Sequence, residues 1–181
     1  MPRSSVIGSA LLLALVPAVS LALAQAPSPP QPGPEHAKLA AFVGTWKGHG
    51  DVKATSLGPG GTMTWTETCE WFDGGFHLVC KSSVEGSAGK RQGLSIRGWD
   101  AETASYTYFG IDSLGWSDFS EGSVKEDTWT WGSERTMEGK IVRSRYTVHQ
   151  LTPTSTKFTF EMQQQGGGWT LVMEGASEKT K

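Results

Sequence analysis

Apolar and polar residues alternate along short segments through most of this chain. Phe158, Phe160 and Met162 alternate with polar positions near the end of the chain, and Trp129 and Trp131 alternate with threonines further upstream. A period of two places every second side chain on the same face of an extended strand. No long helical period follows residue 45. The pattern therefore predicts an all-β protein.

Turn residues divide the chain into segments of similar length, as expected for a meander of strands joined by short hairpins. One or two helical turns are predicted over residues 35–42, where Leu39, Phe42 and Val43 have helical spacing. About ten strands are predicted at residues 47–52, 62–71, 76–83, 93–99, 105–112, 116–124, 128–133, 140–151, 157–164 and 169–178.

One apolar face on each successive strand indicates a sandwich or a closed barrel. Short sequential hairpins favour the antiparallel up-and-down β-barrel, because closure leaves no strand edge exposed. Alternation also places Trp169, Leu171 and Met173 on one face. The prediction is an up-and-down barrel of about ten strands with a short helix before the first strand.

The stretch WTETCEWFDGGFHLVCK, residues 65–81, predicts a β-hairpin with a defined register. If Gly74-Gly75 forms a two-residue turn, Asp73 opposes Phe76, and the numbers of opposed residues add up to 149. Cys69 and Cys80 also add up to 149, so the chain's two cysteines oppose each other. This turn would make them a hydrogen-bonded pair with Cα atoms about 5.5 Å apart. A structural disulfide is predicted; a metal pair is the alternative, without C-x-x-C or clustered histidines to support it.

The N-terminus predicts export. A basic start and an apolar run precede an A-x-A sequence ending at Ala24, so residues 1–24 are predicted to be a signal peptide cleaved after Ala24. An uncleaved membrane anchor is the alternative. Residues 25–34, QAPSPPQPGP, form a proline-rich linker, and residues 35–181 form one domain. We expect a periplasmic or secreted protein with no later membrane-spanning segment.

Composition narrows the class of partner. The formal net charge is −2, so no basic surface for nucleic acid is indicated. Charged residues make up 19% of the chain, which nevertheless contains eight tryptophans. The aromatic side chains favour either a thick core or a cavity lined with apolar surface, and the sequence leaves both open.

An ordered set of motifs resembles a known group of proteins. The set comprises LAAFVGTWKGHG at 39–50, the DGGF hairpin at 73–76, GWD at 98–100, IDSLGW at 111–116 and GGGWTLVMEG at 166–175. It is similar to a bacterial family of uncharacterised lipocalin-like (calycin-type) proteins known only as a domain of unknown function. The resemblance implies an antiparallel barrel with an internal cavity, and it implies that the tryptophan of GTW plugs one barrel end.

A neighbouring group of haem-binding ten-stranded barrels shares the GTW motif and uses a histidine near the C-terminus. This chain has no histidine after His149. Haem therefore stays an unsupported alternative, and no cofactor is predicted. The four histidines are scattered and predict no metal site.

Candidate polar groups lie on several strands. Arg143 and Arg145 share a face with His149 and could meet an acidic head group, although a solvated outer face is the simpler interpretation. The carboxylates selected for a buried polar role are Glu67, Asp112 and Glu161. No catalytic residue is assigned, because no nucleophile with a neighbouring base and no phosphate loop is visible.

The resulting hypothesis is a barrel that holds a small apolar or amphipathic molecule in its lumen. The alternatives are a small barrel enzyme (an isomerase, cyclase or hydrolase) using a luminal carboxylate or histidine, and an envelope protein-interaction module. Oligomeric state is not predicted. The candidate cavity residues are Trp46, Trp65, Trp71, Trp99, Tyr108, Asp112, Trp131, Arg145, His149, Phe160 and Trp169.

Overall fold

The computed structural model describes residues 28–55, 58–87, 89–137, 139–164 and 166–180. The predicted signal peptide and the first residues of the predicted linker lie outside this range. All helices and strands belong to the compact unit formed by residues 31–181. No helix within the described ranges has the length and apolar character needed to cross a membrane.

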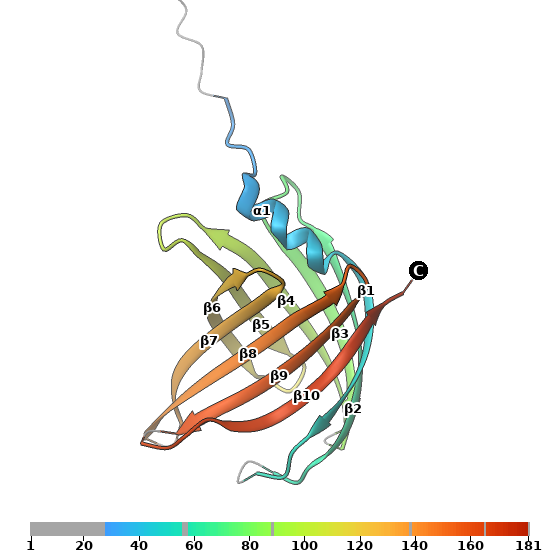
Figure 1. The fold of residues 1–181 in the computed structure, drawn as a ribbon, viewed down its shortest axis with the longest axis vertical. Helices are drawn as coiled ribbons and strands as arrows, with labels where there is room; N and C mark the ends of the chain where they lie inside the picture. The colour runs from blue at the N-terminus through green and yellow to red at the C-terminus, as the bar shows by residue number, and fades with distance from the viewer. Residues whose placement is uncertain (1–27, 56–57, 88, 138, 165, 181) are drawn as a thin grey trace, which may run out of the picture. The chain divides into compact units, whose positions relative to one another are not determined.

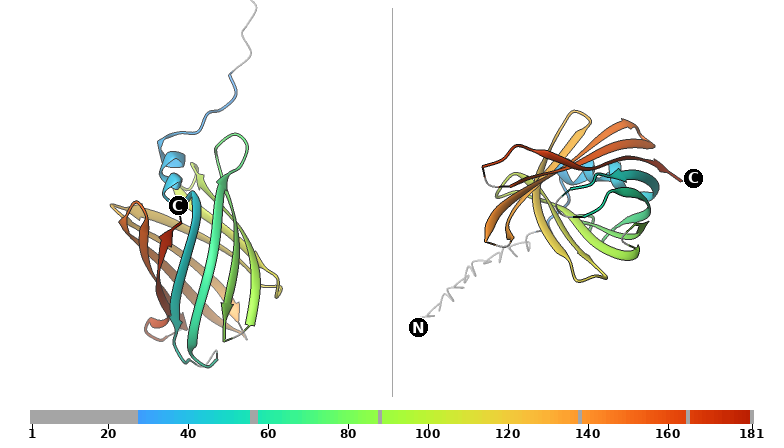
Figure 2. Two further views of the ribbon diagram at one scale, coloured as in Figure 1. Left: turned by 90° about the vertical axis from the view of Figure 1, so that its right-hand side faces the viewer. Right: turned by 90° about the horizontal axis from the view of Figure 1, so that it is seen from below.

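Ten antiparallel strands form a closed barrel, which confirms the predicted fold class (Figures 1 and 2). Sequential strands are neighbours, and β1 pairs with β10 to close the ring. The strands are β1 (Gly44–Val52), β2 (Gly61–Trp71), β3 (Leu78–Gly86), β4 (Gly89–Asp100), β5 (Ser105–Asp112), β6 (Ser117–Lys125), β7 (Thr128–Met137), β8 (Lys140–Thr152), β9 (Ser155–Gln164) and β10 (Thr170–Lys179).

The Cys69–Cys80 hairpin has the predicted register but a different turn. Cys69 pairs with Cys80, and the two form a disulfide. The turn is not the predicted two-residue turn, because the N–H of Phe72 donates to the carbonyl of His77 and the N–H of Gly75 donates to the carbonyl of Phe72. Four residues, 73–76, therefore form the loop, and Gly74 and Gly75 have the positive φ that it requires.

This longer loop changes the type of pair that the cysteines form. A hydrogen bond at the Phe72/His77 pair makes every second pair outward from it hydrogen-bonded, and Cys69/Cys80 falls between two such pairs. The prediction of a hydrogen-bonded pair was therefore wrong. The Cα atoms are 4.0 Å apart, as expected where side chains approach each other most closely.

A short helical segment occupies one end of the barrel. It consists of α1 (Pro34–Lys38) and the 3₁₀ turn η1 (Leu39–Phe42), so the helix begins one residue inside the predicted linker. Proline suits the first helical position because its missing N–H needs no partner there. Leu39 is fully buried, and the indole of Trp46 donates to the carbonyl of Phe42 at 3.0 Å. Figure 1 shows α1 at this end, with the end of β1 and the start of β2 at the other.

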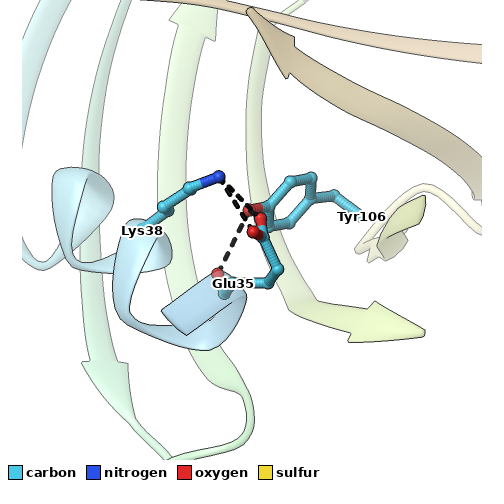
Figure 3. Close-up of polar contacts among 3 residues, drawn as sticks. All are labelled: Glu35, Lys38 and Tyr106. Atoms are coloured by element: carbon cyan, nitrogen blue, oxygen red, sulfur yellow. Dashed lines mark hydrogen bonds and ion pairs between the residues drawn. The ribbon is translucent and has the colours of Figure 1, made fainter. Parts of the chain in front are cut away.

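A polar contact fastens α1 to the barrel wall. The Tyr106 hydroxyl lies 2.6 Å from Oε2 of Glu35, and Lys38 also donates to this carboxylate (Figure 3). The hydrogen bonds from Lys38 and then Tyr106 lower the pKa of the Glu35 carboxyl. Burial and the bond to Glu35 raise the pKa of the Tyr106 phenol, which therefore stays protonated and continues to donate.

We expect the attachment of α1 to weaken in acid. Because the folded-state pKa of Glu35 is lowered, its contribution is complete above the unfolded value of about 4.3 and is lost as the pH falls through the folded value. Hydrogen-exchange protection factors of residues 35–43 should be lower at pH 3 than at pH 6. Tyr106→Phe should reduce this difference, and equal protection factors at both pH values in the native chain would contradict the prediction.

Glycines allow large rings to approach the inside of the wall closely. A Cβ atom at Gly48 would lie 2.0 Å from the ring of Trp65, and one at Gly175 would lie 2.6 Å from the ring of Phe158. These positions need close approach rather than unusual backbone angles. Two bulky rings therefore lie along β1 and β10, at the side of the lumen.

Candidate functional site: the barrel lumen

Strand pairing identifies the inner face of the wall. Trp129 and Trp131 belong to the buried core, so their face of β7 points inward. Residues directly opposite them on β6 and β8 lie on the same face of the sheet and also point inward. Following this register around the ring places Trp65, Tyr108, Tyr146 and Phe158 on the inner face. The end of the lumen near η1 is filled, because Phe42 packs against Trp129 with ring centroids 4.9 Å apart.

An ion pair lies inside the barrel. A guanidinium nitrogen of Arg97 on β4 donates to both carboxylate oxygens of Glu67 on β2, at 2.8 and 2.9 Å. Arg97 is 8% exposed, and its guanidinium carbon lies 4.7 Å from the ring centroid of Phe42. Two opposite charges are thus held beneath the η1 turn by strands that are not neighbours.

The Arg97 guanidinium keeps its charge inside the barrel. Burial alone would lower the pKa of the Arg97 guanidinium, but the Glu67 carboxylate more than offsets this effect and raises it. A buried charge is retained when a partner and hydrogen bonds replace its lost hydration. The lumen therefore contains a fixed dipole among aromatic rings, which can orient a polar group of a bound molecule.

Tyr146 shows that the lumen is not completely filled. Its ring points inward and lies 5.5 Å from Phe158 and 6.4 Å from Trp131, centroid to centroid. The residue nevertheless has 36% of its surface accessible. Burial raises the pKa of its phenol, which fits a group enclosed by the wall. An inward-facing residue with this much accessible surface indicates open space inside the barrel.

A pocket of about 370 Å³ lies at the end of the barrel opposite η1. Val52, Met63, Val84 and Met173 supply apolar surface to it, and Arg91 is a charged residue of its lining. Met63 precedes Trp65 by two positions on the inner face of β2, so the apolar lining of this pocket adjoins the interior aromatic rings. We call this end the mouth.

A second ion pair lies near the mouth, on the other side of the lumen. Arg135 on β7 donates to the Asp118 carboxylate on β6. Its guanidinium carbon lies 5.2 Å from the ring centroid of Trp116, in the connection between β5 and β6. The wall formed by β6 and β7 is therefore more polar here than the wall formed by β1, β2 and β10.

Glu67 and the disulfide lie close together. The carboxylate and the two sulfurs of Cys69 and Cys80 come within 4.8 Å of one another. The sulfurs are bonded to each other, so neither is a thiolate in this state. This group therefore does not form a metal-binding donor set while the disulfide is intact.

The predicted cavity residues divide between the two faces. On the inner face lie Trp65, Tyr108, Trp131 and Phe160, together with Asp112, whose carboxylate accepts the N–H groups of Leu114 and Trp116. Trp46 and Trp99 pack at the η1 end, and Trp71 is 38% exposed near the same end.

Three of the predicted residues lie on the outer face. Arg145 donates to Glu161 and lies over the ring of Trp169 at 4.4 Å, and the Nδ1 atom of His149 shares a hydrogen bond with Thr128. Glu161, which was selected for a buried polar role, forms this ion pair on the outer face instead. Trp169 does not share a face with Met173, because a bulge between Leu171 and Met173 shifts the register of β10.

The sequence did not identify Arg97, Tyr146 and Arg91 as site residues. Arg97 and Tyr146 both lie on the inner face, and each pairs with an inward aromatic residue of the neighbouring strand. Arg97 could have been found from its position two residues before Trp99, because residues two apart on a strand share a face. Its partnership with Glu67 required the register across three strands.

Sequence comparison connects this barrel to a family. A family model described as "Protein of unknown function (DUF1579)" matches residues 31–179. No curated protein gives a significant match to the sequence.

Two solved structures share the fold. The crystal structure of Rv2717c from M. tuberculosis has a TM-score of 0.58 and 12% identity, with 82% of this chain and 99% of the other covered. The S-type phycobiliprotein lyase CPES from Guillardia theta has a TM-score of 0.56 and 10% identity, with 81% and 93% covered. At such identities the likeness establishes the lipocalin-like barrel alone.

Proposed function

The chain belongs to the DUF1579 family of proteins of unknown function, and we propose that it is an exported carrier which binds a small apolar or amphipathic molecule in its lumen. The observation that supports this most directly is the accessible surface of Tyr146 inside the barrel wall. A solid core would have left that residue largely inaccessible.

The lumen has the composition that such a ligand requires. Trp65, Phe158 and Tyr146 offer apolar faces, and the Glu67–Arg97 pair offers a donor and an acceptor at a fixed place. Ligand sites commonly combine a mostly apolar lining with a few convergent polar groups. We take the mouth pocket as the entrance to the lumen, because Met63 and Met173 of the inner face line it.

The proposed location is the periplasm or the extracellular space. The predicted signal peptide and the Cys69–Cys80 disulfide both fit an oxidising compartment. N-terminal sequencing of the protein recovered from the producing bacterium should give a mature chain that begins at Gln25. A chain that still begins at Met1 in the cytoplasm would contradict export.

Calorimetric titration of the mature chain with fatty acids, retinoids and haem tests the binding proposal. Saturable binding of at least one is expected. Met63→Trp places a bulky ring in the mouth pocket and should weaken that binding at least tenfold. Thr64→Trp is the matched control, because the neighbouring residue faces outward and is exposed. No binding by any probe, or equal loss in both variants, would refute a luminal site.

A further inference from the structure

We infer that the luminal ligand is an anionic amphiphile, with its acidic head group beside Arg91 at the mouth and its apolar body extending toward Trp65. This inference rests on the proposed function and specifies its substrate class. Arg91 lies on β4 opposite Val84, on the inner face, and lines the same pocket as Met63 and Met173.

The charges around the mouth leave Arg91 unpaired. The other cation of this pocket, Lys53, forms an ion pair with Glu174. Within the described residues, the Arg91 side chain has neither an ion-pair partner nor a hydrogen-bond partner. Asp112 lies on the adjacent strand, but its Oδ1 atom already accepts two backbone N–H groups.

The other two arginines of the inner face do not compete for an anion. Arg97 is neutralised by Glu67, and Arg135 is neutralised by Asp118. The distance along β4 from position 91 to position 97 is roughly 20 Å at about 3.3 Å per residue. An extended apolar body can therefore lie between a head group at the mouth and the inner ion pair. A guanidinium suits a carboxylate or another oxyanion, which it can bind with two parallel hydrogen bonds.

Three probes with the same alkyl chain test the charge preference at pH 8: dodecanoate and dodecylamine below their micellar concentrations, and 1-dodecanol below its solubility limit. The native chain should bind dodecanoate about 2–10-fold more tightly than dodecanol, and dodecylamine most weakly. Arg91→Gln should remove the preference and Arg91→Glu should reverse it. Arg143→Gln, on an outer arginine that is 55% exposed at its side chain, should leave the order unchanged.

The possible results separate this inference from the proposed function. Equal binding of all three probes by the native chain would overturn the anion preference and leave the luminal site intact. An unchanged preference in Arg91→Gln would overturn the role of Arg91. Failure of all three probes to bind would overturn both.

A second inference comes from the outer surface of β4, β5 and β6. Leu94, Ile96, Phe109, Ile111 and Phe119 are each 38–57% exposed. They form one continuous group, because Leu94 pairs with Ile111, Ile96 pairs with Phe109, and Phe109 pairs with Phe119. We call these five residues the outer patch. Contiguous exposed apolar surface of this kind typically marks an interaction site.

The charges at the border of the outer patch point to a second copy of this chain as its partner. Lys81 on β3 adjoins Leu94 at one side, and Glu121 on β6 lies at the opposite side; both are exposed and neither has a partner within the described residues. In a two-fold dimer, a residue at one side of the interface meets the residue at the other side of its partner. Lys81 would then face Glu121 of the other copy. An anionic lipid surface would instead favour a border of cations.

Sedimentation velocity of the mature chain tests this arrangement. A dimer is expected at 50 µM or below, and Phe109→Asp should make it a monomer, whereas Leu151→Asp at another exposed apolar position should not. Lys81→Glu should weaken the dimer at least tenfold, and adding Glu121→Lys should restore it. A native chain that is monomeric at 50 µM, or a dimer insensitive to Phe109→Asp, would overturn the inference.

Discussion

Replacing Glu67 with alanine is expected to lower the free energy of unfolding by about 3–5 kcal/mol. The variant leaves the Arg97 guanidinium inside the barrel without its carboxylate, and Arg97 is only 8% exposed. An isolated buried charge loses its hydration without compensation. Urea unfolding, followed by circular dichroism, measures the change.

The loss should come from the unpaired charge rather than from the missing pair. Glu67→Leu combined with Arg97→Met should therefore be much closer to the native chain than Glu67→Ala alone. Glu134→Ala is the surface control, because its ion pair with Arg143 is more than half exposed on both sides and should contribute under about 1 kcal/mol. A loss below 1 kcal/mol for Glu67→Ala would show that water hydrates Arg97 inside the lumen.

The hairpin register could be predicted because it depends only on where the centre of the turn lies in the sequence. A turn centred between residues 74 and 75 fixes which residues oppose each other, whether its loop contains two residues or four. Loop length decides something else, namely which pairs are hydrogen-bonded. Turn propensity did not determine loop length, so the type of the Cys69–Cys80 pair was predicted incorrectly.

The inner face could be predicted only where alternation continues without a break. The extra residue in β10 places Met173 inside and Trp169 outside, although the sequence spaces them as neighbours on one face. The Glu67–Arg97 pair illustrates a second limit. Each residue lies on a strand with clear alternation of apolar and polar positions. The two side chains nevertheless contact each other across β3, and no local sequence pattern predicts a contact between strands that are not neighbours.

Loss of the disulfide is expected to lower the free energy of unfolding by about 2–3 kcal/mol. The bond links residues 11 positions apart, so it restricts only a short loop of the unfolded chain, and the chain-entropy model gives a value in this range. Chemical denaturation of the native chain with and without a thiol reductant measures the loss, because reduction removes the cross-link and keeps both side chains.

The double variant Cys69→Ala, Cys80→Ala separates cross-linking from packing. The cysteines are at most 1% exposed and belong to the core, so alanine also removes buried atoms beside Glu67. Its loss should exceed that of the reduced native chain by the cost of this small cavity. Equal stability of the oxidised and reduced native chains would mean that the bond adds nothing to the fold. In that case the closed barrel and its register, rather than the cross-link, would hold β2 and β3 in place.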